Sequence, residues 1–434
     1  MIKSGYKKTE LGEIPEEWDY FKIGDPVVVE KLKAGGTPLR SVSNYYKNGT
    51  IPFVKIEDVV NSHKYLTRTV EFITEDGLTN SSSWVLPTGS ILFSMYASYG
   101  EVSINMIPVA TNQAILGIIP RKEKVDVSFL YYELKNLKNS LKQYLRSTTQ
   151  NNLNANIIKR LIIVLPPLPE QQKIAKILSD TDALIESLDQ LITKKKRIKE
   201  GLMHELLTRG IGHTKFQDTI IGRIPDGWAI KRLLEISELQ RGLSYKGDEK
   251  FNTNISDGYL FLTLNSIKPG GELKDNGWSW IKSDRLRERH FLRQGDIVIA
   301  NTEQSKDGSL IGSPAIVSFP SWYKGNAAVY SMDLSKLNLR ASNFNASFLF
   351  YYLSFIQPFA RKYHTGTGVW HLNLESWAYD LFIPLPPLNE QEKISEILIV
   401  ADKEIEVLQQ KEEKYKMIKE GLMQQLLTGK VRVK

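Results

Sequence analysis

The side chains best suited to chemistry in this sequence lie in loops rich in glycine, hydroxyl, amide and basic residues. The first half of the chain has KAGGTPLRS (33–41), SMYASYG (94–100) and STTQNNLN (147–154). Amide side chains suit adenine, Arg and Lys suit guanine, and hydroxyl groups reach phosphates. These loops therefore predict contacts with nucleic acid. The candidate contact residues of this half are Lys33, Gly35, Gly36, Thr37, Arg40, Ser41, Lys55, Ser94, Tyr96, Tyr99, Thr148, Gln150, Asn151 and Asn152.

The second half carries comparable loops with different residues, namely QRGLSYKG (240–247), NTEQSKDG (301–308) and KYHTGTGVWH (362–371). The glycines of the first half, Gly35 and Gly36, are expected to let backbone N–H groups approach an anion. Gly, Asn and Ser are also ordinary turn formers, so a turn role stays open for each residue. The candidates of the second half are Arg241, Tyr245, Lys246, Asn301, Thr302, Gln304, Lys306, Lys362, Thr365, Thr367 and Trp370.

Sequence signatures of catalysis are missing. There is no G-x-x-x-x-G-K-[ST] phosphate loop and no G-x-G-x-x-G cofactor loop after a strand. The chain has no cysteine, and its six histidines form no H-E-x-x-H pair. His364 and His371 flank one loop but lack nearby carboxylate ligands, so we expect no metal site. We predict a chain that binds and does not catalyse.

Composition limits the possible partners and location. The chain has 434 residues with a formal net charge of +8, which favours partners rich in phosphate, with membrane surfaces second. The N-terminal residues are polar, and no apolar run approaches the roughly 20 residues that span a bilayer. We expect a cytoplasmic protein without membrane association.

The sequence contains an internal duplication. LPPLPEQQKI (165–174) returns as LPPLNEQEKI (385–394), and IKEGLM occurs at 198–203 and 418–423, in both cases 220 residues apart. TELGEIPEEW (9–18) matches TIIGRIPDGW (219–228), and SFLYYELKN (128–136) resembles SFLFYYLSF (347–355). Between these markers the two copies differ. The pattern indicates one architecture that presents two specificities.

Short alternating runs such as TIPFVKIEDV and GDIVIANTE predict strands, and helices are expected around 127–145 and 346–361. The fold class is therefore α+β, with two mixed α/β domains, two long antiparallel helices and an internal two-fold pseudo-symmetry. We place the first recognition domain at 1–164, the first spacer helix at 165–209, the linker and second domain at 210–384, and the second helix and tail at 385–434.

Apolar residues in steps of three and four mark a narrow stripe along each long helix, as in a coiled coil. The expected pairing residues are Ile174, Ile177, Leu184, Leu188, Leu191, Ile198 and Leu202 in the first helix, and Ile394, Ile397, Leu408, Tyr415, Ile418 and Leu422 in the second. Packing of each helix on its own domain remains the alternative. The basic run KKKRIK (194–199) is interpreted as a solvated helix face, with phosphate binding as the alternative.

The sequence resembles the specificity subunits of type I restriction-modification systems. The resemblance rests on LGEIPEEW and IGRIPDGW, on GGTP with IPFVK, on both proline–helix motifs and on both IKEGLM helix ends. It implies that each domain reads one half of a split double-stranded DNA target. It also implies helices that dock two methyltransferase subunits, with restriction subunits joining them. S-adenosylmethionine, ATP and magnesium would be used by those partners, with no cofactor bound by this chain.

The second domain departs from the family pattern, because QRGLSYKG stands where the first domain has GGTP. Two other classes stay open. One is a stand-alone duplicated DNA-binding regulator without a methyltransferase partner. The other is a carbohydrate- or protein-binding scaffold, in which tryptophan-rich loops such as NGWSW (276–280) would form a sugar platform.

Overall fold

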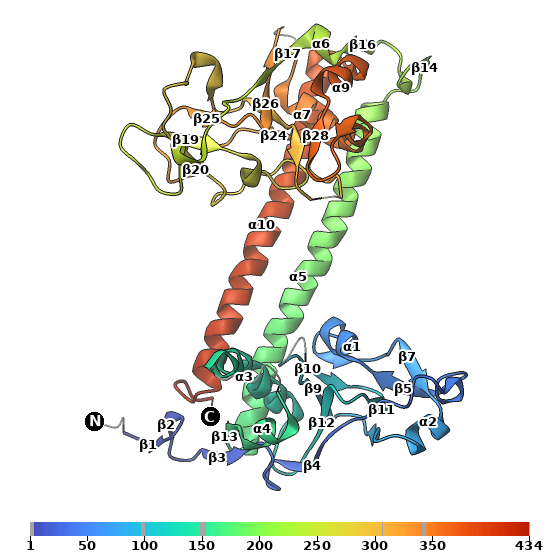
Figure 1. Cartoon of the computed structure of the whole chain (residues 1–434), viewed down its shortest axis with the longest axis vertical. Helices are drawn as coiled ribbons and strands as arrows, with labels where there is room; N and C mark the ends of the chain where they lie inside the picture. The colour runs from blue at the N-terminus through green and yellow to red at the C-terminus, as the bar shows by residue number, and fades with distance from the viewer. Residues whose placement is uncertain (1–3, 97–99, 148–152, 306, 341–343, 434) are drawn as a thin grey trace. The chain divides into compact units, whose positions relative to one another are not determined.

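The computed structural model describes residues 4–96, 100–147, 153–305, 307–340 and 344–433, and of 139–147 only the helical backbone (Figure 1). The chain forms two compact units. Unit 1 contains Met1–Gln190 together with Gln409–Lys434, and unit 2 contains Leu191–Leu408. In the described part of the chain, no helix is long and apolar enough to cross a membrane.

Two long helices, α5 (Leu168–Arg209) and α10 (Leu388–Leu426), each contribute one part to unit 1 and the other part to unit 2. Each begins directly after a Pro-Pro pair, because proline presets the first helical turn but cannot continue a preceding strand ladder. The amide of Gln171 donates to the Pro166 carbonyl at 2.8 Å, and that of Gln391 donates to the Pro386 carbonyl at 2.9 Å. The same start is therefore built twice.

Unit 1 contains two main sheets. The first has the strand order β4-β12-β9-β10-β6 (Val29–Ala34, Ile115–Pro120, Ile91–Ser94, Val102–Asn105 and Tyr65–Leu66). The second has the order β7-β5-β11-β8 (Glu71–Ile73, Ile51–Val54, Val109–Thr111 and Val85–Leu86). Pairs β5–β11 and β6–β10 are parallel, and the other pairs are antiparallel.

Smaller elements complete unit 1. The two-stranded sheets are β1–β2 (Tyr6–Thr9 and Gly12–Pro15) and β3–β13 (Asp19–Lys22 and Ile162–Leu165), and the helices are α1 (Ile56–Asn61), α2 (Glu75–Thr79), α3 (Val127–Ser147) and α4 (Ala155–Arg160). The run TIPFVKIEDV is only half strand, because β5 ends at Val54 and α1 begins at Ile56.

Unit 2 repeats most of the topology of unit 1. Its four-stranded sheet has the order β17-β26-β22-β24 (Ser237–Arg241, Leu334–Leu339, Ile297–Ala300 and Pro314–Ile316). Its five-stranded sheet has the order β18-β20-β19-β25-β21 (Lys250–Phe251, Ser279–Ile281, Tyr259–Leu262, Ala328–Tyr330 and Phe291–Leu292). The parallel pair β19–β25 stands where unit 1 has β5–β11. The prediction of two mixed α/β domains with long helices is confirmed.

Unit 2 also has a three-stranded sheet of its own, β23-β28-β27 (Thr302–Glu303, Trp370–Leu372 and His364–Thr365). The pairs β14–β15 (Phe216–Thr219 and Gly222–Pro225) and β16–β29 (Ala229–Arg232 and Phe382–Leu385) correspond to β1–β2 and β3–β13. Its helices are α6 (Leu233–Ile236), α7 (Ala346–Phe355), α8 (Gln357–Ala360) and α9 (Leu374–Asp380). The helix expected over 346–361 is thus interrupted at Ile356, between α7 and α8.

Within each unit, α5 and α10 pack together and on the domain. In unit 1, Ile174 and Leu178 of α5 share a core cluster with Leu426 and Leu427, at the end of α10. In unit 2, Leu206 and Leu207 near the end of α5 share a cluster with Ile394 and Leu398 of α10. The start of one helix therefore meets the end of the other in both units, so the helices are antiparallel. Packing on the domain and packing between helices coexist.

The buried stripe differs from the predicted one at every second position. Among the predicted pairing residues, Ile174, Leu188 and Ile394 are buried, whereas Leu191, Ile198, Ile397 and Ile418 are 39–46% exposed. The other six are partly buried: Ile177, Leu184, Leu202, Leu408, Tyr415 and Leu422. Leu178, Ile192, Leu398 and Ile405 are buried in place of Ile177, Leu191, Ile397 and Glu404. The sequence offers adjacent apolar pairs such as Ile177–Leu178, and the structure buries the second member of the pair. The buried residues therefore follow one another in steps of four and then three, where steps of three and then four were predicted.

The basic run at 194–199 contributes two contacts with α10 in unit 2. Lys195 pairs with Glu404 at 2.6 Å, and Lys199 pairs with Asp402. Lys194, Lys196 and Arg197 are exposed. This agrees with a largely solvated helix face.

Candidate nucleic-acid interface

One glycine in each unit creates the same close crossing of two chain segments. A Cβ on Gly35 would lie 2.0 Å from the Thr111 carbonyl oxygen, and a Cβ on Gly242 would lie 2.3 Å from the Tyr330 carbonyl oxygen. Only glycine fits where two backbones approach so closely. QRGLSYKG therefore occupies the place of KAGGTPLRS, although the sequences hardly match.

Backbone hydrogen bonds around these glycines are also repeated. The Gly35 N–H donates to Ile115 at 3.2 Å, and the Gly242 N–H donates to Leu334 at 3.1 Å. The Gly36 N–H donates to the Thr111 carbonyl at 3.0 Å. The expectation that Gly35 and Gly36 offer free N–H groups to an anion is therefore wrong, because backbone carbonyls already accept from both groups.

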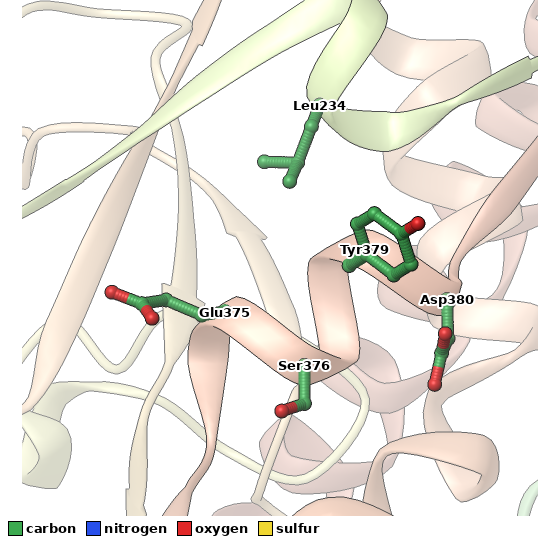
Figure 2. A pocket seen from close by; sticks show the side chains of 5 residues that line it. All are labelled: Leu234, Glu375, Ser376, Tyr379 and Asp380. Carbon is green, nitrogen blue, oxygen red and sulfur yellow. The ribbon is translucent and has the colours of Figure 1, made fainter.

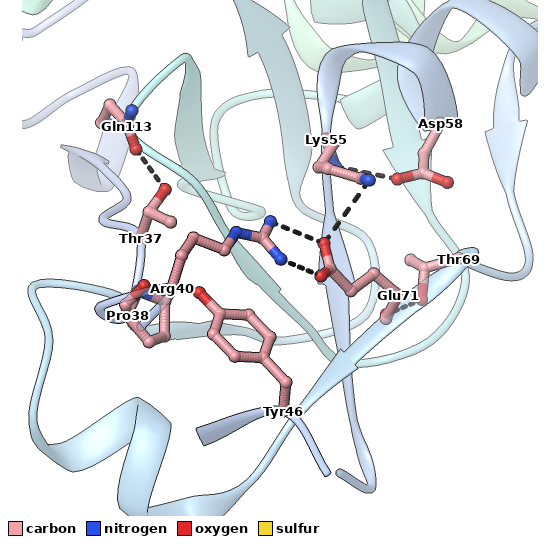
Figure 3. A network of polar contacts seen from close by, with 9 residues as sticks. All are labelled: Thr37, Pro38, Arg40, Tyr46, Lys55, Asp58, Thr69, Glu71 and Gln113. Atoms are coloured by element: carbon pink, nitrogen blue, oxygen red, sulfur yellow. Dashed lines mark hydrogen bonds and ion pairs between the residues drawn. The ribbon is translucent and has the colours of Figure 1, made fainter. Parts of the chain in front are cut away.

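The loop after Gly36 presents a polar network on unit 1 (Figure 3). The Thr37 hydroxyl donates to the Gln113 amide oxygen. The guanidinium of Arg40 donates to both carboxylate oxygens of Glu71 and lies 4.4 Å from the centroid of the Tyr46 ring. Lys33, Arg40 and Ser41 are exposed, and Thr37, Lys55 and Tyr96 are partly exposed.

Glu71 joins two predicted contact residues. The Lys55 ammonium lies 3.5 Å from Glu71 Oε2, on the carboxylate that Arg40 also contacts. The hydrogen bond from Arg40 lowers the pKa of Glu71 against the opposing effect of burial. No signal in the sequence marks Glu71, Tyr46 and Gln113, because acidic, aromatic and amide residues on short strands and turns follow no recognisable pattern.

Three predicted contact residues point into the protein instead of outward. Ser94 is fully buried, and its hydroxyl accepts from the Glu101 N–H at 3.1 Å. Asn301 donates to the Ser335 hydroxyl at 2.9 Å, and Thr302 donates to Asp333 at 3.1 Å, both from buried positions. Each lies within two residues of the end of a central strand, where the surrounding core encloses the side chain. The prediction of direct contacts by these three is therefore corrected.

A buried carboxylate and an arginine order two loops of unit 2. Glu303 accepts the backbone N–H groups of Leu310 and Ile311 at 3.1 and 2.9 Å. Arg361 donates to the Gly308 carbonyl at 2.9 Å, which joins this loop to the 361–371 segment. Gln304 is left exposed beside them.

The 361–371 segment carries an aromatic pair. The rings of His364 and Trp370 stack with centroids 4.1 Å apart. In this unit Arg241, Lys246, Lys362, Thr365 and Thr367 are exposed, whereas Tyr245 packs edge-to-face on Phe261 at 5.0 Å and is half buried. Tyr99, Thr148, Gln150, Asn151, Asn152 and Lys306 lie outside the described residues.

Two shallow hollows lie beside these loops. Figure 2 shows the first, of about 600 Å³, lined by Leu234, Glu375, Ser376, Tyr379 and Asp380. Two carboxylates line it, which disfavours a phosphate there.

The second hollow, of about 740 Å³, brings the predicted contacts Arg241 and Thr365 together with Arg340 and His371. Glu238 and Glu375 also line it. The two hollows share Leu234 and Glu375, and only the second has basic side chains for a nucleic-acid backbone.

The tryptophans of NGWSW take part in packing. Trp278 meets Phe319 edge-to-face at 6.2 Å, and Trp280 meets Tyr323 at 6.1 Å. Both indoles are half buried, so they do not form the open platform on which a sugar would stack. Within the described residues, no group of three His, Asp or Glu side chains could hold a metal ion.

The sequence matches the family described as "Type I restriction modification DNA specificity domain" twice, over residues 15–197 and 225–416. The putative type I restriction enzyme MjaX specificity subunit of Methanocaldococcus jannaschii is 30% identical, and the alignment covers 100% of this chain and 98% of that protein. The MjaVIII specificity subunit of the same organism is 26% identical, with 100% and 99% covered.

Two solved structures share the fold. One, titled as the structural basis of complex assembly and conformational transition of the type I R-M system, has a TM-score of 0.58 at 18% identity and covers 96% of this chain and 99% of its own. The other, the type I restriction-modification S subunit from M. genitalium, has a TM-score of 0.53 at 15% identity, with 94% and 96% covered.

Proposed function

Because the chain belongs to the type I restriction modification DNA specificity family, we propose that it is the subunit that selects the DNA target of a type I restriction-modification enzyme. Each unit reads one half of a split double-stranded site. The globular domains supply the reading surfaces, and the long helices set the distance between the half-sites.

One observation carries this proposal. The crossing at Gly35 and Thr111 recurs at Gly242 and Tyr330, yet the side chains presented around the two crossings differ. Two domains that share a fold but present different surface residues are suited to recognising two different DNA sequences. The two half-sites should therefore differ, and the complete site should be asymmetric. Recognition on one face of the duplex predicts half-site centres about one helical turn, roughly 10 base pairs, apart.

The helices of unit 2 also carry an apolar stripe that the partner helix leaves uncovered. Leu191 and Ile198 of α5 are 39% and 46% exposed, and Val400 and Val407 of α10 are 56% and 62% exposed. Each pair is seven residues apart, so its members lie on one helix face. Such faces bury against further helices, and we assign this one to a methyltransferase subunit. Two methyltransferase subunits bind the chain, and restriction subunits join that complex.

Chemistry belongs to the partners in this proposal. The methyltransferase subunits use S-adenosylmethionine, and the restriction subunits use ATP and magnesium. The chain itself is not an enzyme and binds no cofactor, in keeping with the missing catalytic motifs of its sequence. It acts in the cytoplasm, where host DNA is present.

The proposal is tested by expressing the chain with and without its methyltransferase partner in a methylation-free host and mapping methylated bases across the genome. We expect methylation only when both are present, at one split and asymmetric motif. Methylation by the chain alone, or a continuous or palindromic motif with the pair, contradicts the proposal.

A further inference from the structure

The guanidinium of Arg40 is fixed in place and yet exposed. Its Nη1 and Nη2 groups donate to the two oxygens of Glu71, the second at 2.9 Å. The ring of Tyr46 lies under the guanidinium at 4.4 Å. Despite these contacts, the Arg40 side chain keeps 53% of its surface exposed, whereas Glu71 keeps only 20%. In the ion pair drawn in Figure 3, the carboxylate is therefore the more buried partner and the guanidinium the more exposed one.

Both partners of Arg40 are themselves held firmly. The backbone of Glu71 pairs with Phe53 in the β5–β7 ladder, and its carbonyl accepts the Thr69 hydroxyl at 2.8 Å. The Tyr46 hydroxyl donates to the Pro38 carbonyl, which fixes the ring. The orientation of the guanidinium is thus set before any ligand arrives, which reduces the entropy lost on binding.

An arginine side chain has five N–H donors, of which Glu71 takes two. The other three make no hydrogen bond within the described part of the chain. They include the Nε–H and a neighbouring Nη–H, which form a second fork along the side of the guanidinium. Guanine offers two adjacent acceptors, O6 and N7, in the major groove, and this fork matches them.

The negative charge of Glu71 makes Arg40 better suited to contact a base than a phosphate. Arg40 and Lys55 both pair with the carboxylate of Glu71. Its negative charge weakens the attraction of both cations for phosphate. A guanine edge is uncharged, so it loses little from the carboxylate and gains from the fixed fork. The network therefore favours reading a base over holding the backbone.

We propose that Glu71 is a positioning residue that presents the free edge of Arg40 to a guanine in the half-site read by unit 1. This inference rests on the proposed function, because it names one base contact of that reading surface. Glu71 acts through Arg40, and Arg40 makes the contact.

The experiment uses the complete chain with its methyltransferase partner and duplexes that carry the mapped target. Each guanine of the target is replaced in turn by 7-deazaguanine, which lacks the N7 acceptor. We expect the natural chain to lose affinity by about five- to 100-fold at one guanine of one half-site. Glu71→Gln and Arg40→Lys should each bind the unmodified target more weakly and should no longer respond to that replacement.

Two controls separate positioning from a general loss of structure. Asp296→Asn removes a carboxylate of unit 2 that pairs with Lys336 at 2.7 Å and is similarly buried. It should leave the response to every 7-deazaguanine unchanged. Glu71→Gln should also leave responses within the other half-site unchanged and should not weaken binding to an unrelated duplex. Arg40→Lys is a surface change that keeps the charge, so it tests the contact even if Glu71→Gln folds poorly.

Salt dependence decides between guanine and phosphate. Arg40→Ala should leave the slope of log affinity against log salt unchanged, whereas loss of a phosphate contact lowers it by about one. A lowered slope, or a Glu71→Gln complex that still responds to the same guanine, overturns the inference. If the natural complex binds no specific duplex, the proposed function itself fails.

Discussion

The hydroxyl of Tyr132 donates a hydrogen bond to the Asp182 carboxylate at 2.7 Å, which joins α3 of the domain in unit 1 to α5. Lys419 of α10 forms an ion pair with the same carboxylate. One acidic side chain therefore connects the domain with both long helices. The domain of unit 1 is therefore attached to a junction of three helices, α3, α5 and α10.

Unit 2 contains the same junction. The Tyr351 hydroxyl of α7 donates to Asp402 of α10 at 2.8 Å, and Lys199 of α5 pairs with that carboxylate. Lys199 and Lys419 are 220 residues apart, as are Asp182 and Asp402. Each carboxylate receives its lysine from the helix of the other sequence repeat. This exchange makes the two repeats dependent on each other.

Replacing Asp182 with Asn should lower the free energy of unfolding by about 1–3 kcal/mol, because a charge-assisted hydrogen bond and an ion pair are lost together. Asp402→Asn is the matched change in unit 2. Its effect should be smaller, since the Asp402 side chain is 40% exposed and that of Asp182 is 23% exposed. Urea unfolding of both variants measures the difference, and an equal or larger effect at Asp402 contradicts this view of the junction.

Stability should depend on pH through Glu133 of α3. Its side chain is 4% exposed, its Oε1 has no hydrogen-bond partner within the described residues, and burial raises its pKa to about 8. A raised pKa means that the folded state favours the protonated acid. The stability associated with the proton is fully present below the ordinary pKa of 4.5 and is lost as pH rises through about 8.

Glu133→Gln cannot lose this proton, so the variant should become more stable than the natural chain above pH 4.5. The difference should grow by about 1 kcal/mol for each pH unit up to about pH 8 and then level off. Chemical unfolding at several pH values measures it. The exposed Glu200→Gln serves as the control and should show no such trend. A Glu133→Gln difference that does not vary with pH would show that the carboxyl group titrates normally.

Residues 1–212 alone should form a dimer. In the full chain, Leu426 and Leu427 share a buried core cluster with Ile174 and Leu178 of unit 1. A second copy of the fragment offers Leu206 and Leu207, which play the equivalent part in unit 2. An antiparallel pairing of identical helices is self-complementary, so approximate symmetry would become exact.

With the methyltransferase present, this dimer should modify a palindromic split site built from the first half-site and its inverted copy. Leu188→Asp should prevent dimerisation, because a carboxylate would be buried at a position now 5% exposed. The matched change Leu191→Asp, at a 39% exposed position, should leave the dimer intact. Sedimentation and methylation mapping give the readout. A monomeric fragment, or a dimer that still directs methylation to the asymmetric site, would contradict the predicted antiparallel pairing of the two helices.

The exposed stripe of unit 2 should bind the methyltransferase subunit. Leu191→Lys with Val407→Lys should reduce copurification of that subunit strongly while changing the free energy of unfolding by less than about 1 kcal/mol, since both residues are at exposed positions. Lys196→Glu on α5 is an exposed control outside the stripe and should bind normally. Normal copurification of the double variant would exclude this face as the docking site.

The sequence alone was sufficient for the duplication, the class of fold and the long helices. These features depend on local and repeated signals: proline before a helix, heptad spacing, and short strands bounded by turns. Ile174, Leu188 and Ile394 could be identified as pairing positions because both possible stripes contain them. Such signals act over a few residues, so they can be read without knowing what lies beside them in space.

Tertiary structure decided which face of each helix is covered and which loop residues reach the surface. Leu191 and Ile192 are equally apolar, and only packing against the neighbouring elements exposes the first and buries the second. Asn301 has an amide side chain of the kind that reads bases, but it is buried just after β22 and donates to Ser335. Gly242 matches Gly35 only because each crosses a strand end contributed by a residue far along the chain, Tyr330 for Gly242 and Thr111 for Gly35. Arg40 and Glu71 likewise meet across 31 residues. Contacts of this range depend on how strands are ordered within a sheet, and the alternation of side chains along one strand does not determine that order.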